Sequence, residues 1–174
     1  MELVDRVRAP LITAAIGREG DVVPARLARG CLCFAVWIEG ALGGFGWLST
    51  GPEWIGEIQL EIKPREREAY IWNCVTLDEH RRKGVFRSVV FGITNAARRL
   101  GTKRVWIGSM AIPAEKTLEP LGFQPALYFD HVTFAGIHLM RVRGSAHRDL
   151  ASDASSVVGA SPGLMLRASH PRRH

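Results

Sequence analysis

The sequence predicts an α/β domain with a mixed sheet, and three observations lead to this fold class. Between residues 31 and 77, several stretches are rich in β-branched and aromatic residues, which favours strands. After Gly84 the spacing of the apolar residues changes from about two to about 3.6, which indicates one long helix. A further apolar stretch follows, so the unit from Ala69 to Met110 predicts two parallel strands joined by a right-handed helical crossover.

Two short helices and a hairpin are expected first. The stretches 10–17 and 23–30 each end in a glycine, a residue that often terminates helices. Residues 31–38 and 42–49 carry β-forming side chains on either side of a Glu-Gly turn, which predicts a hairpin.

Strands and helices then alternate along the rest of the chain. Residues 55–63 alternate apolar and charged side chains and predict one half-buried strand, and 69–77 predicts the next. The long helix is expected over 85–100, where apolar residues recur at helical spacing up to Leu100. The remaining expected elements are a strand at 103–110, a short helix at 112–123 whose last turn is irregular at Pro120, and strands at 124–129 and 132–142.

Residues 1–144 are expected to form a single domain, and residues 145–174 a disordered tail. The chain has 174 residues, of which 47% are hydrophobic, so one ordinary core can form. The tail is rich in Ala, Ser, Gly and Pro and has no sustained apolar period. The last strands of two copies could pair with each other, so a homodimer stays an open alternative.

Neither a membrane span nor a secretory signal is expected. No run of about eighteen apolar residues occurs, and the first residues include acids without a long apolar block. The cytoplasm is therefore the expected location. Cys31, Cys33 and Cys74 are odd in number and irregularly spaced, so we expect reduced cysteines in the packing and no metal site.

Three consecutive cations, Arg81, Arg82 and Lys83, precede Gly84 at the expected start of the long helix. A helix N-terminus presents unpaired backbone N–H groups and a partial positive charge, and glycine lets a ligand approach the backbone closely. The pattern therefore predicts a phosphate-binding turn, in agreement with a net charge of +6. The alternative is a solvated basic turn that only caps the helix.

In its surroundings this turn resembles the signature of the GNAT superfamily, the acyl-coenzyme A-dependent N-acyltransferases. The signature Q/R-x-x-G-x-G/A stands here as Arg81–Phe86, between the strand at 69–77 and the amphipathic helix. A Pro-Leu-Gly-Phe stretch ending at Phe123 precedes a late strand, in the family's order, and the resemblance covers Arg29 to Arg143. It implies a mixed, mostly antiparallel sheet with a central strand–helix–strand crossover, flanked by helices.

The resemblance implies acetyl-CoA, or another acyl-CoA, as cosubstrate and no metal. The strand backbone would pair with the pantetheine arm, and the N–H groups of the turn would hold the pyrophosphate, with charge added by the basic side chains. The residues implied are Cys74, Val75, Thr76, Arg81, Arg82, Lys83, Gly84, Val85 and Phe86. Phe86 departs from the small residue of the signature, but the helical register places its ring on the core stripe, so the backbone stays available.

The chemistry implied by the resemblance is direct attack of an amine on the thioester. Leu118 and Ala111 stand where the family often has a tyrosine acid and an asparagine. Replacement candidates are Tyr70 and Glu68, which are two residues apart on one strand, and Tyr128 on a later strand. For each of them the alternative is a packed ring or a solvated carboxylate.

The acceptor side offers Glu53, Trp54 and Glu57, which are candidates for binding a cationic amine. The expected function is N-acyl transfer, most simply of acetyl, to a small-molecule or peptide amine. One alternative is a non-catalytic acyl-CoA-binding or regulatory protein of the same fold. A nucleic-acid-binding module, suggested by the charge, is disfavoured because no binding motif is present.

Overall fold

The structure is a computed structural model that describes residues 1–17, 20–110, 116–134 and 137–168. The chain forms two compact units, the first of Met1–Gly51 with Pro64–Phe123 and the second of Pro52–Lys63 with Gln124–His174. This differs from the single domain expected over 1–144. The reason is that residues 52–63 pack with the C-terminal part, where the Lys63 N–H donates to the Val157 carbonyl over 2.8 Å.

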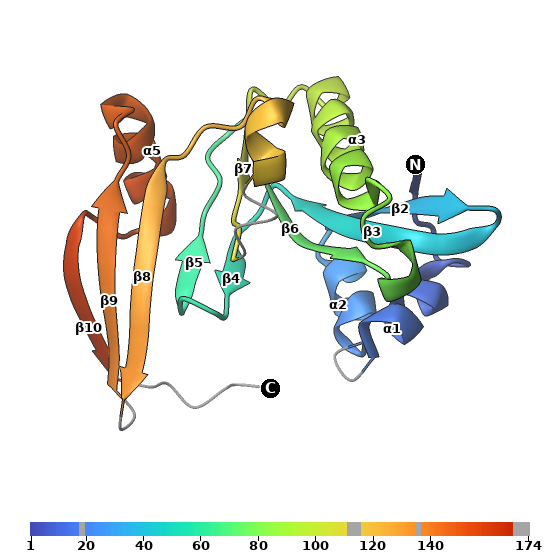
Figure 1. Ribbon diagram of the computed structural model, residues 1–174, viewed down its shortest axis with the longest axis horizontal. Coiled ribbons are helices and arrows are strands. Elements are labelled where there is room, and N and C mark those ends of the chain that lie inside the picture. The colour runs from blue at the N-terminus through green and yellow to red at the C-terminus, as the bar shows by residue number, and fades with distance from the viewer. Residues whose placement is uncertain (18–19, 111–115, 135–136, 169–174) are drawn as a thin grey trace. The chain divides into compact units, whose positions relative to one another are not determined.

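The first unit is built on a five-stranded sheet with the strand order β1-β2-β3-β6-β7 (Figure 1). The strands are β1 (Glu2–Leu3), β2 (Leu32–Ile38), β3 (Ala41–Ser49), β6 (Glu68–Thr76) and β7 (Arg104–Ile107). Neighbouring strands are antiparallel except β6 and β7, which are parallel. The predicted mixed, mostly antiparallel sheet with a strand–helix–strand crossover is confirmed. The short edge strand β1 was not expected from the sequence.

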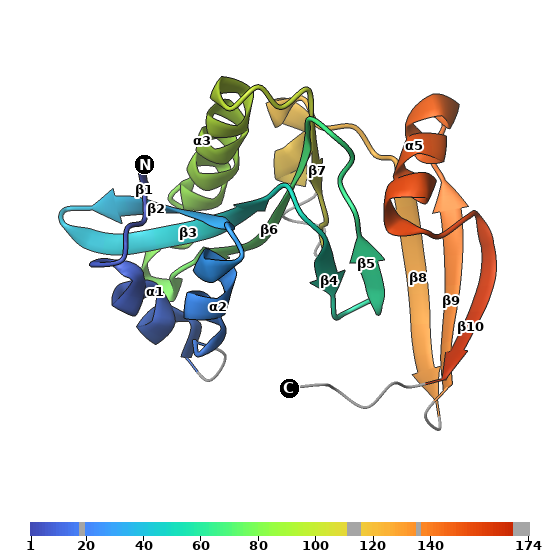
Figure 2. The ribbon, with the colours of Figure 1, turned by 180° about the vertical axis from the view of Figure 1, so that it is seen from behind.

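Helices cover both faces of this sheet, as Figure 2 shows from behind. They are α1 (Ala9–Ile16), α2 (Val22–Ala28) and α3 (Val85–Arg99). On the α3 face, Val89 and Ile93 are fully buried against Ile71 of β6. On the other face, Ile12 and Val23 of α1 and α2 are buried in a second apolar cluster. The predicted stripe of α3 is thus confirmed, except that Phe86 is only half-buried and that Leu100 lies past the last turn and is 62% exposed.

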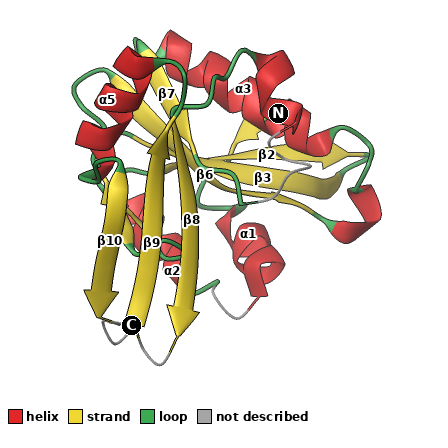
Figure 3. Ribbon diagram, turned by 60° about the vertical axis from the view of Figure 1, so that its left-hand side comes forward, coloured by secondary structure: helices red, strands yellow, loops and turns green. Residues whose placement is uncertain are grey.

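The second unit contains a short hairpin, a three-stranded sheet of order β10-β9-β8 and one helix, and Figure 3 shows the sheet with the helix. The elements are β4 (Glu53–Ile55), β5 (Leu60–Ile62), β8 (Leu127–Phe134), β9 (Ile137–Gly144), α5 (Arg148–Val158) and β10 (Gly163–Ala168). The single strand expected over 55–63 is wrong, because the chain turns between β4 and β5. Gln59 in this turn has a left-handed φ of 51°.

The expected disordered tail is also corrected. Residues 148–158 form α5, whose buried residues Ala151, Ala154, Val157 and Val158 recur at helical spacing, and Gly159 ends it in a left-handed conformation. Residues 163–168 form β10, which pairs with β9. Because alanine is small, this apolar stripe adds little to the hydrophobicity of the segment, and the composition alone does not reveal it.

Two smaller differences concern the region after β7. The last two expected strands divide after Phe134 rather than after Phe129. Of the short helix expected at 112–123, residues 116–118 are helical and Glu119–Leu121 form a 3₁₀ turn, as Pro120 leads one to expect. Ala111 lies outside the described residues.

Candidate functional site

Strand β6 has one edge that is only partly paired. It pairs with β3 from Tyr70 to Thr76, but β7 pairs only with Glu68–Ile71 among the described residues. Backbone groups beyond that point on the β7 side are therefore available to an extended ligand, in the manner of an added strand. Cys74, Val75 and Thr76, the residues predicted for the pantetheine arm, lie on this part of β6.

A β-bulge interrupts β6 at Asn73. Asn73 and Cys74 together oppose only Gly46 of β3, between the regular pairs Trp47–Trp72 and Phe45–Val75. Asn73 has a left-handed φ of 47°, a conformation that asparagine tolerates better than most residues. The extra residue bends the strand and shifts its side chains by one position.

The bulge changes which face each β6 side chain occupies. Ile71 before it packs in the α3 cluster, and so does Cys74 after it. Trp72 and Val75 pack instead in the cluster beneath α1 and α2. Burial raises the pKa of the Cys74 thiol to about 12, so this cysteine stays protonated and is a poor nucleophile near neutral pH.

The basic turn, defined as Arg81–Gly84, connects β6 to α3 after a 3₁₀ turn. All four residues are exposed, and two of them are left-handed, Arg82 with a φ of 62° and Gly84 with a φ of 77°. Arg81 forms an ion pair of 2.7 Å with the exposed Asp78. The basic turn that was predicted at the start of the helix thus has the geometry of an anion-binding turn.

The first turn of α3 adds unpaired backbone donors. The first helical hydrogen bond after Gly84 runs from the Ser88 N–H to the Gly84 carbonyl, so the N–H groups of 85–87 have no acceptor within the helix. No acidic residue lies in this turn. Phe86 is half-buried at the margin of the buried stripe that starts with Val85. The ring of Phe86 therefore does not turn fully into the core, but the donors of the first turn remain.

Three buried polar atoms along this segment have no hydrogen-bond partner among the residues that the structure describes. They are Trp72 Nε1, Thr76 Oγ1 and His80 Nδ1. Buried polar atoms usually have partners, so a group without one needs an explanation. Trp72 lies in the cluster beneath α1 and α2, but a polar ligand along the edge of β6 and the basic turn would supply partners for Thr76 Oγ1 and His80 Nδ1, and these two residues therefore fit a cosubstrate with amide and phosphate groups.

Tyr70 lies where β6 and β7 separate. Tyr70 is 6% exposed. It lies opposite Trp106 of β7, one position before the last β6–β7 pair. A Cβ placed on Gly108, just beyond β7, would be 3.2 Å from the Tyr70 hydroxyl. The hydroxyl is therefore close to the point at which the strands part.

Glu68 links β6 to β7 at the start of their pairing, where it lies opposite Arg104. It is 7% exposed and accepts hydrogen bonds from Trp106 Nε1 over 2.9 Å, from the Arg65 N–H over 3.2 Å and from Arg104 Nη1 over 3.4 Å. These contacts hold β7 and the preceding turn against β6. A catalytic part for Glu68 stays a prediction.

The predicted acceptor residues lie in the second unit. Glu53 and Trp54 are on β4, where Glu53 is 6% exposed and Trp54 is 60% exposed. Glu57 is exposed in the turn between β4 and β5. The basic turn and Tyr70 belong to the first unit. The continuous segment of β6 and the basic turn that carries the cofactor candidates therefore does not contain these three residues.

Tyr128 also belongs to the second unit, on β8. The Arg143 guanidinium carbon lies 5.4 Å from its ring centroid, and the same guanidinium forms two hydrogen bonds with Asp130, of 3.0 and 3.4 Å. The Arg143 guanidinium lowers the pKa of Asp130 below its ordinary range. This group is a surface cross-strand cluster.

One contact of the site could not be found from sequence spacing. Arg26 of α2 donates a hydrogen bond from Nη1 to Asn73 Oδ1 over 2.9 Å and lies over the Trp72 ring, 4.1 Å from its centroid. The two hydrogen-bonded residues are 47 positions apart. No motif signals this pairing, because it depends on how α2 lies on the sheet.

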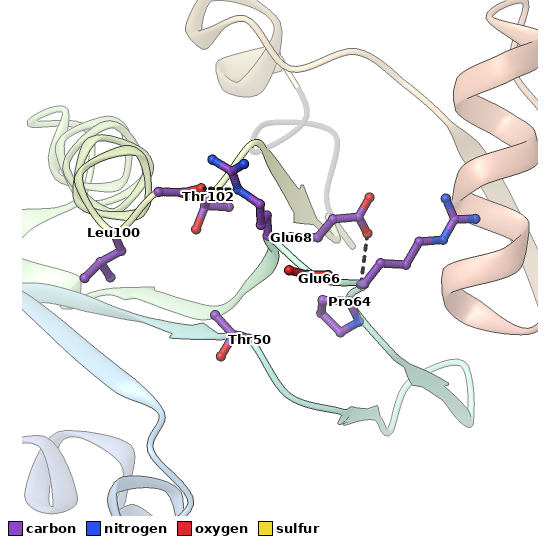
Figure 4. Close-up of a pocket in the computed structure, with 9 residues that line it drawn as sticks. Thr50, Pro64, Glu66, Glu68, Leu100 and Thr102 are labelled. Carbon is purple, nitrogen blue, oxygen red and sulfur yellow. Dashed lines mark hydrogen bonds between the residues drawn. The ribbon is translucent and has the colours of Figure 1, made fainter.

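A pocket of about 430 Å³ lies at the opposite end of α3 from the basic turn (Figure 4). Its lining includes Thr50, Pro64, Glu68, Leu100 and Thr102. With 15 residues, α3 is about 22 Å long at 1.5 Å per residue, so this pocket is remote from the proposed phosphate site. Its Glu68 carboxylate is already hydrogen-bonded to β7.

Within the described residues, no three side chains of His, Cys, Asp or Glu are arranged to hold a metal ion. No helix in that part of the chain is both long and apolar enough to cross a bilayer. Leu118, which stands in the place of the family's usual tyrosine, is buried.

Comparisons with known proteins agree with this geometry. The profile of the acetyltransferase (GNAT) family matches residues 14–123. A Bacillus subtilis acetyltransferase in complex with CoA is 20% identical, with a TM-score of 0.56 and 78% of this chain and 88% of that chain covered. A ribosomal-protein-alanine N-acetyltransferase of Brucella melitensis is 16% identical, with a TM-score of 0.52 and 77% and 97% covered.

An aminoglycoside N-acetyltransferase in complex with CoA, AAC(6')-Iy, is 13% identical, with a TM-score of 0.52 and 76% of this chain and 95% of that chain covered. At these identities the structural likeness establishes the fold alone. No curated protein matches the sequence.

Proposed function

This chain belongs to the acetyltransferase (GNAT) family, and from that premise we propose that it is an N-acyltransferase that transfers an acetyl group from acetyl-CoA to an amine. The observation that carries the proposal is the continuity of two features. The edge of β6 that β7 leaves unpaired among the described residues is followed by one 3₁₀ turn, the basic turn and the first turn of α3. A strand edge suits an extended amide chain, and the turn suits a pyrophosphate.

Binding would use these features in order. The backbone of Cys74–Thr76 would hydrogen-bond the pantetheine amides. The N–H groups of Arg82–Phe86 would hold the pyrophosphate, and the side chains of Arg81, Arg82 and Lys83 would add charge-assisted hydrogen bonds. Thr76 Oγ1 and His80 Nδ1, which lack partners among the described residues, support a polar ligand here.

For the chemistry we assign the proton donor to Tyr70. The amine nitrogen attacks the thioester carbon, the carbon–sulfur bond breaks, and the thiolate takes the Tyr70 hydroxyl proton. The amine proton then returns to the tyrosine oxygen, directly or through solvent. The position of the hydroxyl beside Gly108, where the strands part, supports this role. Glu68 and Tyr128 stay as the other two candidates.

The acceptor is an amine, and its class is left to experiment. Glu53, Trp54 and Glu57 remain candidates for contacting a cationic acceptor because two carboxylates and an exposed indole lie close in sequence. The solved neighbours include enzymes named for aminoglycosides and for a ribosomal protein. Both acceptor classes, small molecule and peptide, therefore belong in a first screen.

A second candidate function is non-catalytic binding of acyl-CoA. One observation favours it: the buried Leu118 cannot donate the proton that a tyrosine at that position would supply. The same cosubstrate site would then serve a regulatory purpose. The two functions differ in turnover and not in binding.

The first experiment is a calorimetric titration with acetyl-CoA. The Arg82→Glu/Lys83→Glu double variant should weaken binding at least about tenfold, because it reverses the charge of the basic turn. The matched control is Arg98→Glu/Arg99→Glu, which makes the same change in net charge at the opposite, exposed end of α3 and should change Kd by less than about threefold. Absence of acetyl-CoA binding by the folded parent would overturn the proposal.

A thiol-release assay with a panel of amines then separates the two functions. The Tyr70→Phe variant should lower kcat by about a hundredfold with little change in the Kd of acetyl-CoA, if Tyr70 is the proton donor. Unchanged kcat in this variant would remove Tyr70 from the mechanism. Binding without turnover by any amine of the panel would favour the non-catalytic function.

A further inference from the structure

One side chain joins helix α2 to the bulge of β6. The guanidinium carbon of Arg26 lies 4.1 Å from the centroid of Trp72 and 5.2 Å from that of Trp47. These two indole rings stack with centroids 5.9 Å apart and an angle of 28° between their planes. The cation thus lies against a pair of aromatic rings, where it is attracted to their faces.

The same guanidinium also contacts the residue that makes the bulge. Arg26 Nη1 donates to Asn73 Oδ1 over 2.9 Å, and Asn73 is the left-handed residue of β6. Trp72 and Asn73 are consecutive, so Arg26 fixes both the side chain before the bulge and the bulge residue itself.

The bulge decides which backbone groups face the unpaired edge. Because successive residues of a strand point their backbone groups to opposite edges, loss of the bulge would shift the residues after it by one position and change which of Cys74–Thr76 face the unpaired edge. The N–H and C=O groups on the edge that is proposed to hold the pantetheine arm would then come from different residues at different positions. Whatever holds the bulge at Asn73 therefore sets the hydrogen-bonding pattern of that edge.

We propose that Arg26 is a positioning residue, which holds the β6 bulge at Asn73 so that the Cys74–Thr76 edge keeps the register that binds acyl-CoA. This inference rests on the proposed function of that edge. It adds a consequence that the family signature does not contain. The position of α2, which carries none of the signature residues, is coupled to the affinity for the cosubstrate.

The test measures acetyl-CoA affinity in Arg26→Ala, Arg26→Lys and Arg26→Ala/Asn73→Gly. Arg26→Ala should raise Kd about tenfold, and Arg26→Lys should lie between it and the parent because lysine keeps the charge but not the planar fork. Asn73→Gly in the Arg26→Ala background should bring Kd back to within about threefold of the parent, because glycine adopts the left-handed conformation without support. A merely structural role of Arg26 would lower the melting temperature without this restoration.

The control variant is Arg98→Ala. Arg98 also donates from Nη1 to an asparagine, Asn95 Oδ1, over 3.3 Å, but on the exposed surface of α3. Its removal should leave Kd unchanged. Equal Kd values for Arg26→Ala and the parent would overturn the inference, and so would a loss of affinity that Asn73→Gly does not restore.

Amide hydrogen exchange separates this inference from the proposed function, since it needs no ligand. Exchange at residues 73–76 should become faster in Arg26→Ala and slow again in Arg26→Ala/Asn73→Gly. If the parent does not bind acetyl-CoA, the proposed function fails, and this exchange pattern alone decides whether Arg26 holds the bulge. Unchanged exchange in Arg26→Ala would show that it does not.

Discussion

Gly44 of β3 lies against residues of both parts of the proposed cosubstrate site, β6 and the start of α3. A Cβ at this position would be 2.6 Å from the Val75 carbonyl oxygen and 2.7 Å from Val85 Cγ1. Both distances are far below van der Waals contact, and the first involves backbone that is held in the β3–β6 ladder. Gly44→Ala must therefore push β6, the start of α3, or both away from β3.

The expected loss of stability follows from these contacts. Overpacking a core typically costs about 1–3 kcal/mol, and a fixed carbonyl cannot rotate away as a side chain can, so we expect about 2–3 kcal/mol. In a chain of this size that corresponds to a fall in Tm of roughly 4–12 °C. The same displacement should weaken acetyl-CoA binding, because Val75 and Val85 are both among the proposed contacts.

Urea unfolding followed by tryptophan fluorescence measures this loss. In a Trp54→Phe background every remaining tryptophan lies in the first unit, so the signal reports that unit alone. Gly51→Ala is the matched control, because its Cβ would be an ordinary 3.9 Å from Ser49 Oγ, and it should cause no loss. Equal unfolding midpoints for Gly44→Ala and Gly51→Ala would refute the reasoning.

Three further outcomes are expected. Glu68→Ala should cost about 1–3 kcal/mol in urea unfolding, because it leaves the buried Trp106 N–H without its acceptor, and Glu68→Gln should recover most of this loss. Burial raises the pKa of the Cys74 thiol from 9.0 to about 12, so alkylation at pH 8, followed by mass spectrometry, should be about a thousandfold slower than in the unfolded chain. The stability linked to that protonated thiol is complete below pH 9 and is lost as the pH rises towards 12. Arg143→Ala should raise the pKa of Asp130 in an NMR titration, because the guanidinium that lowers it is gone; its stabilising effect is present above the carboxyl's unfolded pKa and is lost on acidification.

Strong periodicity explains why much of the first unit could be predicted. The apolar residues of α3 repeat at helical spacing, and their burial follows from that repeat. The basic turn before Gly84 was recognisable because cations, a glycine and a helix start are adjacent in sequence. Local patterns of this kind do not depend on the rest of the fold.

The failures have an equally physical basis. Residues 55–63 alternate between apolar and polar side chains, as a single strand would. Gln59 nevertheless adopts a left-handed φ that its local sequence does not predict, and the chain folds back there. The helix α5 was missed because alanines such as Ala151 and Ala154 form its apolar stripe without raising the apparent hydrophobicity. The contact between Arg26 and Asn73 joins distant parts of the chain, so only the tertiary structure creates it.

The bulge of β6 also explains a feature of its neighbour strand. Glycine weakens a strand, yet Gly46 lies directly opposite the extra residue, and a Cβ there would be 2.8 Å from Cys74 Sγ, Ile93 Cδ1 and Val89 Cγ1. The missing side chain leaves room for Cys74 to turn towards α3 and for α3 to lie close to the sheet. The proposed cosubstrate site joins the edge of β6 to the basic turn and the start of α3, so the spacing of its parts depends on β3, which carries none of the predicted cosubstrate residues. Affinity for acetyl-CoA should therefore fall in Gly44→Ala and Gly46→Ala, although neither glycine is a predicted cosubstrate residue.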